Sequence, residues 1–242
     1  MKNRLLSLLI LCTLLSGGSA LAFAGDDAAS PFCLPTPAGT LRLGMGDTDT
    51  SYWLDACAVK KKSSSRETRY TVTNKKTNPK GSIELSVIPL THTEGFILKA
   101  SALTSDTDLY WAFGACAAQD ANANNASQSF YQSAALQPDA CKYNVFSVEG
   151  CAFTTYFGES MKLKVVQAVT PLGGEIRLSD AHRQESPRRF WESGKKTDAP
   201  ALGGKVKLTV GEPLYFCFYR QNREADYNYY LLPALYNEES TK

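Results

Sequence analysis

Hydrophobic and polar residues alternate along the centre of the chain. In residues 81–116, the hydrophobic members of this pattern are Ile83, Leu85, Val87, Phe96, Leu98, Ala100, Ala102, Leu109, Trp111 and Phe113. Polar turns at residues 91–95 and 104–108 interrupt the alternation. A repeat of two residues broken by polar turns is typical of an antiparallel meander that buries one face. This stretch therefore predicts consecutive antiparallel strands.

Short hydrophobic segments of the same kind recur through the rest of the chain. The further predicted strands are residues 40–43, 52–59, 70–73, 143–148, 152–157, 161–168, 176–178, 205–210 and 214–219. Only residues 182–191 show a helical pattern, and Pro187 interrupts it. We therefore predict an all-β fold, an antiparallel β-sandwich of about a dozen strands with at most one short helix.

The N-terminal residues 1–24 have the features of a secretory signal peptide. A basic start precedes a hydrophobic run, and residues 22–24 (Ala-Phe-Ala) offer a cleavage site after Ala24. We expect export to the periplasm or the extracellular space. No later segment has the length of a membrane helix, so no membrane insertion is expected after cleavage. The remaining predicted parts are a leader at residues 25–38, a single β-sandwich domain at residues 39–236 and a C-terminal tail at residues 237–242.

The charge of the chain gives no reason to expect binding to nucleic acid. The chain has 26 Lys and Arg and 24 Asp and Glu residues. Loss of the signal peptide removes Lys2 and Arg4, so the remaining chain has 24 basic and 24 acidic residues and no formal net charge. A chain without net positive charge has no overall attraction to a polyanion. Basic residues concentrate in residues 60–80. They fit a site for an acidic glycan or another anion, but we favour an edge strand whose lysines discourage pairing with other chains.

Apart from Cys12 in the signal peptide, the chain has six cysteines. They are Cys33, Cys57, Cys116, Cys141, Cys151 and Cys217. An even number of cysteines in an exported chain indicates disulfides. We expect at least two, with Cys33–Cys57 and Cys141–Cys151 as the pairs suggested by proximity. Buried thiols are the alternative, above all for Cys217 between two phenylalanines. The spacing fits no zinc motif, and we expect neither a metal nor another cofactor.

The sequence contains none of the common catalytic motifs. Its two histidines, His92 and His182, lie in predicted turns and loop edges, and no residue is assigned a catalytic role. Aromatic side chains are better candidates for a binding site, because their rings pack against the apolar faces of sugars. We select Tyr110, Trp191 and Trp53 as candidate substrate-binding residues. Packing in the core or at its edge is the alternative for each of them.

Several short segments together resemble one family. They are residues 94–99 (EGFILK), 109–114 (LYWAFG), 179–181 (SDA), 204–208 (GKVKL) and 212–215 (EPLY). Their order and spacing over most of residues 39–220 are similar to the domain-of-unknown-function family 4450. The resemblance implies a β-sandwich in front of a helical, glycosidase-like barrel, in exported proteins of Gram-negative polysaccharide degraders. It supplies no catalytic residue for this region.

The chain also departs from this family pattern. We expect no helical domain after the predicted sandwich, and the chain carries additional cysteines, Cys116, Cys141, Cys151 and Cys217. The resemblance and the missing catalytic residues together favour an exported, non-catalytic module that is accessory to glycan recognition or processing. The expected partner is a glycan or a glycan-processing protein.

Two alternatives from other functional classes remain. A β-jelly-roll polysaccharide lyase would act on a uronate-containing glycan, and residues 65–69 and 215–221 look loosely like two of the three motifs of alginate lyases. The middle Gln-x-His motif is absent, although β-elimination needs charge neutralisation and a base together. A protein-interaction module of the cell envelope would instead use a sheet face or edge for contact.

Overall fold

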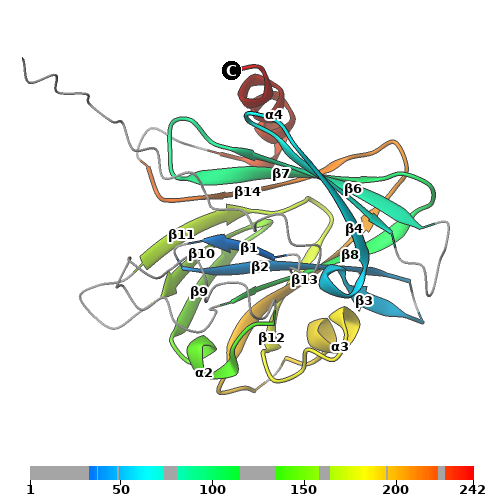
Figure 1. The fold of residues 1–242 in the computed structure, drawn as a ribbon. Coiled ribbons are helices and arrows are strands. Elements are labelled where there is room, and N and C mark those ends of the chain that lie inside the picture. The colour runs from blue at the N-terminus through cyan, green and yellow to red at the C-terminus, as the bar shows by residue number, and fades with distance from the viewer. Residues whose placement is uncertain are drawn as a thin grey trace, which may run out of the picture.

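Two β-sheets packed face to face form the body of the computed structural model (Figure 1). The structure describes residues 33–36, 38–47, 49–73, 81–114, 135–157, 164–194, 196–222 and 227–242. The predicted signal peptide at residues 1–24 lies outside these ranges, so its cleavage and the export of the chain stay predictions.

The smaller sheet has the strand order β1-β2-β8-β13-β12, and β3 pairs with β2 beside this path. Its strands are β1 (Cys33–Thr36), β2 (Gly39–Gly46), β3 (Ser51–Trp53), β8 (Thr107–Gly114), β12 (Glu175–Asp180) and β13 (Pro200–Leu208). All of these pairings are antiparallel.

The larger sheet has the strand order β4-β5-β6-β7-β14-β11-β10-β9. Its strands are β4 (Ala58–Ser63), β5 (Thr68–Thr73), β6 (Ser82–Pro89), β7 (Gly95–Ala102), β9 (Asn144–Glu149), β10 (Ala152–Phe157), β11 (Lys164–Val169) and β14 (Leu214–Tyr219). These pairings are antiparallel as well. The predicted all-β, antiparallel β-sandwich is therefore confirmed.

The third strand of the predicted meander belongs to the other sheet. β6 and β7 form the expected hairpin, with Val87 opposite Leu98. β8 instead crosses to the smaller sheet, where it lies between β2 and β13. The alternation of hydrophobic residues is the same in both sheets of a sandwich, so the pattern places a strand on the core without telling which sheet it joins.

Aromatic side chains from both sheets meet in the interior. Trp111 and Phe113 of β8 face Phe153 of β10 and Phe218 of β14. The ring centroids of Trp111 and Phe153 are 5.8 Å apart, and those of Phe113 and Phe218 are 5.3 Å apart. These ring contacts connect the two sheets across the core. Stacked and tilted aromatic pairs at this spacing stabilise the fold beyond what the burial of their apolar surface contributes.

Helices lie only on the outside of the sandwich in the described part of the chain. They are η1 (Leu54–Ala56), α2 (Pro138–Cys141), α3 (Pro187–Glu192), η3 (Tyr229–Leu231) and α4 (Leu232–Thr241). α3 begins at Pro187, which suits the first turn of a helix, and Ser186 caps it by accepting a hydrogen bond from the backbone N–H of Arg189. The helical pattern at residues 182–191 therefore becomes a helix only from Pro187 onward. None of the described helices is long and apolar enough to cross a membrane.

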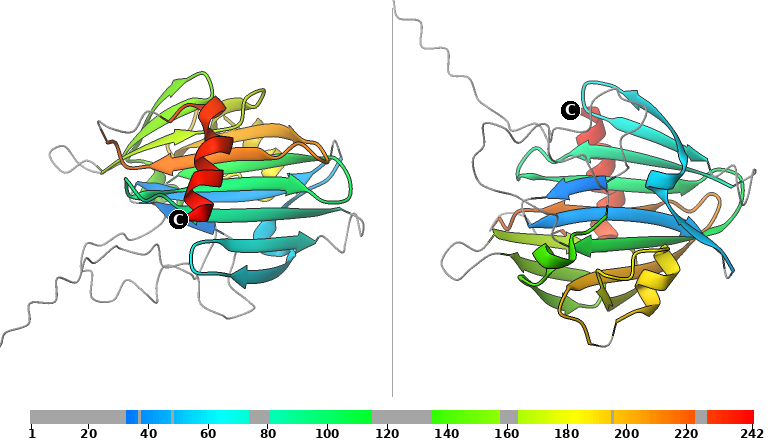
Figure 2. Two further views of the ribbon diagram at one scale, coloured as in Figure 1. Left: turned by 90° about the horizontal axis from the view of Figure 1, so that it is seen from above. Right: turned by 60° about the horizontal axis from the view of Figure 1, so that its bottom comes forward.

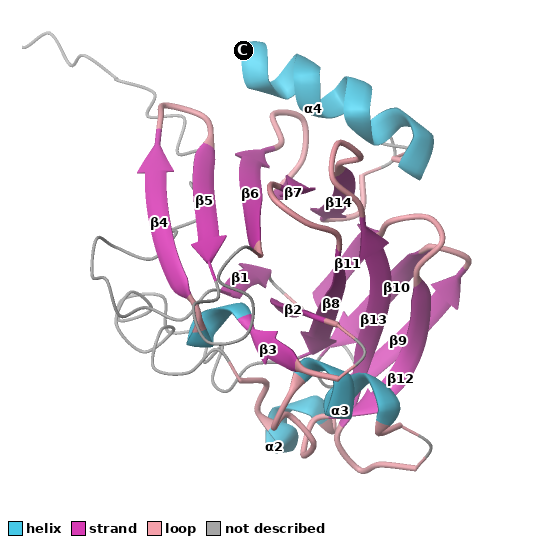
Figure 3. Cartoon of the chain, turned by 90° about the vertical axis from the view of Figure 1, so that its right-hand side faces the viewer, coloured by secondary structure: helices cyan, strands magenta, loops and turns pink. Residues whose placement is uncertain are grey.

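The two longer helices cover opposite outer faces (Figure 3). α4 crosses the outer face of the larger sheet, as the view from above shows (Figure 2), and buries Leu232 and Tyr236 there. α3 lies on the outer face of the smaller sheet. Phe190 of α3 packs there against Gly203, which leaves room for the ring because it has no Cβ.

The predicted disulfides Cys33–Cys57 and Cys141–Cys151 are wrong in this structure. Cys57 and Cys151 each carry a free thiol, as does Cys217. Cys217 is buried beneath α4, as the buried-thiol alternative predicted. Since β-sheets of this size bury a large core, the fold does not depend on cross-links as a small secreted domain would.

Candidate functional site

The structure gathers the three predicted binding residues around α3. Tyr110 of β8 lies edge to face with Trp191 of α3, at a centroid distance of 6.5 Å and an angle of 71°. Trp53, at the end of β3, packs against Phe190 of the same helix at 5.9 Å. The three aromatic residues therefore share one face of the smaller sheet, although they are far apart in sequence.

Burial closes most of this cluster to a ligand. Tyr110 and Trp53 are only 1% and 5% exposed. Trp191 is half-buried, and the guanidinium carbon of Arg177 lies 4.0 Å from the centre of its ring. Such cation–π stacking holds the indole in place but covers a face that a sugar would need. A role of Tyr110, Trp191 and Trp53 in substrate binding stays a prediction, and Trp191 is the only one of them that is not buried.

A groove with a volume of about 530 Å³ lies on the outer face of the larger sheet. Its floor includes a row of four side chains that are successive neighbours across four strands, Ser147 of β9, Thr154 of β10, Gln167 of β11 and Tyr219 of β14. Neighbouring strands are about 4.8 Å apart, so the row extends over roughly 14 Å. This length suits an extended ligand of several small rings.

Tyrosines from the segment before α4 form one wall of the groove. Tyr227 packs edge to face on Tyr219, with ring centroids 4.7 Å apart at 87°. Tyr229, the first residue of η3, also lines the groove, as does Asn228 between the two tyrosines in sequence. Burial raises the pKa of both Tyr227 and Tyr229. Their hydroxyls therefore stay protonated at neutral pH and can donate hydrogen bonds.

The polar side chains on the floor are available to a ligand. Ser147, Thr154 and Gln167 make no hydrogen bond through their side chains to other described residues. Together they offer hydroxyl and amide groups that both donate and accept hydrogen bonds. Among the described residues that line the groove, Glu149 is the only charged one, and none is a Lys or an Arg. The described lining is therefore polar, aromatic on one side and without a cation that could pair with an acidic ligand.

Sequence reasoning missed these residues because they come from four separate strands. A polar residue between hydrophobic ones, such as Gln167 between Val166 and Ala168, marks a residue on the outer face. That alternation was the one available signal. It does not reveal that β14 lies next to β11, which brings Gln167 beside Tyr219.

The arginines of the two lyase-like motifs are already paired with carboxylates. Arg69 forms ion pairs with Glu67 at 3.0 Å and Glu84 at 3.8 Å. Arg220 lies 3.4 Å from Glu94. An arginine that neutralises a uronate must be free to approach it. The described geometry therefore does not favour a lyase site at these motifs.

Comparisons with known proteins identify a family but no activity. The family model of a domain of unknown function, DUF4450, matches residues 34–240. Among solved structures, a bacterial glucoamylase complexed with acarbose is similar at 12% identity and a TM-score of 0.46, over 90% of this chain. The chain spans only 32% of that glucoamylase chain. No curated protein sequence matches this chain.

Proposed function

The chain belongs to the DUF4450 family of domains of unknown function, and we propose that this member is a non-catalytic module that binds a neutral glycan. The proposed site is the groove across β9, β10, β11 and β14. The observation that carries the proposal is the row of polar side chains Ser147, Thr154 and Gln167, which have no hydrogen-bond partner among the described residues and lie beside a wall of tyrosines.

Sugar rings have the surface that such a groove complements. Their hydroxyls both donate and accept hydrogen bonds, as do the side chains of Thr154 and Gln167. Their C–H faces are apolar and pack on aromatic rings such as those of Tyr227 and Tyr229. The volume of about 530 Å³ lies in the range of sites for small organic ligands.

The charge of the groove favours a neutral over an acidic glycan. A uronate carboxylate moved into the groove would lose water without gaining a positive partner among the described lining residues, and Glu149 would repel it. The same argument weighs against the alternative of a uronate-specific lyase. The proposal places the module in the periplasm or outside the cell, on the strength of the signal-like residues 1–24.

Affinity electrophoresis of the chain lacking residues 1–24 in gels with neutral or uronate-containing polysaccharides tests this proposal. We expect retardation by at least one neutral polysaccharide. The double change Gln167→Ala and Tyr229→Ala should weaken it at least about tenfold, since a lost ring contact and hydrogen bond together amount to about 1.4 kcal/mol or more. Circular dichroism checks that the variant is folded.

Two control variants locate the contact. Tyr230→Ala removes an adjacent tyrosine that is 79% exposed and outside the groove lining, and it should leave binding unchanged. Trp191→Ala tests the aromatic cluster under α3 and should also bind normally. Loss of binding in Trp191→Ala alone would move the site to the smaller sheet.

Other outcomes would overturn the proposal. Absence of retardation by every glycan would leave a protein partner as the better hypothesis for this surface. Release of an unsaturated uronate product, seen as new ultraviolet absorbance, would establish a lyase instead.

A further inference from the structure

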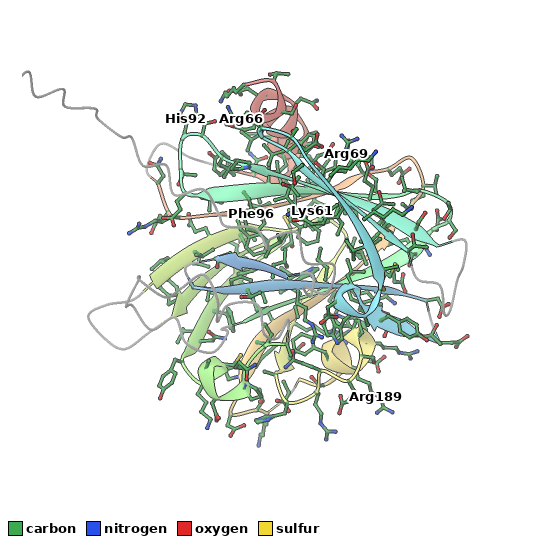
Figure 4. The ribbon with its side chains drawn as sticks, in the orientation of Figure 1. Lys61, Arg66, Arg69, His92, Phe96 and Arg189 are labelled. Carbon is green, nitrogen blue, oxygen red and sulfur yellow. The ribbon has the colours of Figure 1, made fainter. Side chains whose placement is uncertain are left out.

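Three side chains of residue types that commonly ligate metals meet where α4 approaches the turn between β6 and β7. They are His92 of the turn and Glu238 and Glu239 of the last turn of α4. One donor atom from each lies within 4.8 Å of the other two. Figure 4 shows His92 on the turn beside α4, on the same side as Arg66. The group is separate from the glycan groove, whose lining contains none of these residues.

A positive charge already lies among these donors. The ammonium nitrogen Nζ of Lys242 is 2.8 Å from Oε1 of Glu238 and 3.0 Å from Oε1 of Glu239. It is also 3.5 Å from Nε2 of His92. The three side chains are thus arranged around one cation, which the chain itself supplies.

The buried glutamate is held by its other oxygen. Glu239 is only 1% exposed, and its Oε2 accepts a hydrogen bond from the hydroxyl of Thr91. Arg66 donates to that hydroxyl at 2.9 Å and lies 3.5 Å from the same carboxylate oxygen. Contacts of this kind orient a metal ligand from behind. They leave Oε1 of Glu239 facing His92 and Glu238.

We propose that His92, Glu238 and Glu239 form a binding site for a divalent transition metal of the zinc class, which takes the place of the Lys242 ammonium. One imidazole and two carboxylates are ligands that Zn²⁺ accepts in proteins, at about 2.0–2.2 Å, with a fourth position left for water. The bound metal fastens α4 to the β6–β7 turn. Lys242 competes with the metal because both need the same carboxylate oxygens.

Isothermal titration of the chain lacking residues 1–24 with ZnCl2 tests the site, and thermal unfolding with and without Zn²⁺ gives a second readout. We expect binding of one Zn²⁺ and a rise of the melting temperature that grows with the Zn²⁺ concentration. His92→Ala should weaken binding at least about tenfold, as loss of a ligand does. Lys242→Met should strengthen it, because the competing ammonium is gone.

The second histidine of the chain provides a matched control. His182 lies on another part of the surface, next to Asp198, so His182→Ala should bind Zn²⁺ like the unchanged protein. Glu238→Gln changes an exposed ligand without burying anything new, which keeps the test independent of the folding of Glu239 variants. Spectra of the Co²⁺ complex should lack the thiolate absorption that binding to cysteine would give.

Equal Zn²⁺ affinity of His92→Ala and the unchanged protein would overturn the proposal. So would thiolate absorption of the Co²⁺ complex, or the absence of Zn²⁺ binding in both the unchanged protein and Lys242→Met. The glycan-binding test is independent of these results, because it uses different variants and a different ligand.

Discussion

At the scale of single residues, the indole ring of Trp111 explains why position 204 requires a glycine. A Cβ on Gly204 would overlap the indole ring of Trp111, which is buried between the sheets. We expect Gly204→Ala to lower the free energy of unfolding by about 1–3 kcal/mol, because the core is close-packed and the ring has to move. Urea unfolding followed by tryptophan fluorescence measures this change.

A second glycine gives the control for this prediction. At Gly174 the nearest atoms to an added Cβ are 3.2–3.3 Å away, so Gly174→Ala should cost clearly less. Equal losses in the two variants would mean that the contact with Trp111 does not set the requirement for glycine at position 204.

Alternation along β8 predicted which side chains face the core but not how exposed the others are. Trp111 is in the core and Tyr110 points to the other face, as expected from a repeat of two residues. Tyr110 is nevertheless buried, because α3 and Trp191 lie over it. The outer face of a strand is open only if nothing packs on it, and that depends on distant parts of the chain.

At the scale of elements, α4 is fixed by a polar contact as well as by hydrophobic packing. The hydroxyl of Tyr236 donates to Glu67 at 2.9 Å and lies 2.7 Å from the hydroxyl of Ser86. Tyr236→Phe should therefore lower the free energy of unfolding by about 1.5–3 kcal/mol, the usual contribution of a hydrogen bond to a charged group. Thermal or urea unfolding measures the loss.

Tyr230→Phe is the matched control, because Tyr230 is largely exposed at the beginning of the same region. It should leave stability unchanged. A loss in Tyr236→Phe no larger than in this control would show that packing of the ring alone holds α4 to the sheet.

The same helix shows a limit of sequence reasoning at this scale. Residues 227–236 were placed in the predicted β-sandwich domain, and no helix was predicted there. The buried residues Leu232, Tyr236 and Glu239 do have helical spacing. One of the three is a glutamate, and its burial makes sense only with Thr91 and Arg66 beside it. A hydrophobic pattern could not show this face.

At the scale of the whole molecule, the fold class followed from the sequence and the order of the strands did not. Hairpins such as β6–β7 and β9–β10 join neighbours in sequence, and short turns predict them. The pairs β7–β14 and β11–β14 join distant segments. The groove for which we propose glycan binding lies on the second of these pairs, so the sequence could not reveal it before the strand order was known. Contacts between distant segments also bring together the predicted binding residues Tyr110, Trp191 and Trp53, and Tyr110 and Trp53 are buried there.

Acid should destabilise the whole molecule through carboxylates that the fold keeps ionised. Burial alone would raise the pKa of Glu67, but hydrogen bonds from Ser86, Arg69 and Tyr236 outweigh it and hold the pKa below the ordinary value of 4.5. In the unfolded chain Glu67 takes up a proton near that ordinary value. Below it the unfolded state therefore binds more protons than the folded state, and stability falls with the pH.

Urea unfolding without added metal, at several values between about pH 7 and pH 3, measures this dependence. The free energy of unfolding should stay level above about pH 5 and decrease below it, until the pH passes the lowered pKa of Glu67. Glu67→Gln cannot titrate, so its stability should depend less on pH in this range, while exposed Glu212 offers the control Glu212→Gln. If Glu67→Gln kept the full acid dependence, the network under α4 would not be its source, and other carboxylates with a lowered pKa, such as Asp47 on the β2–β3 turn, would have to account for it.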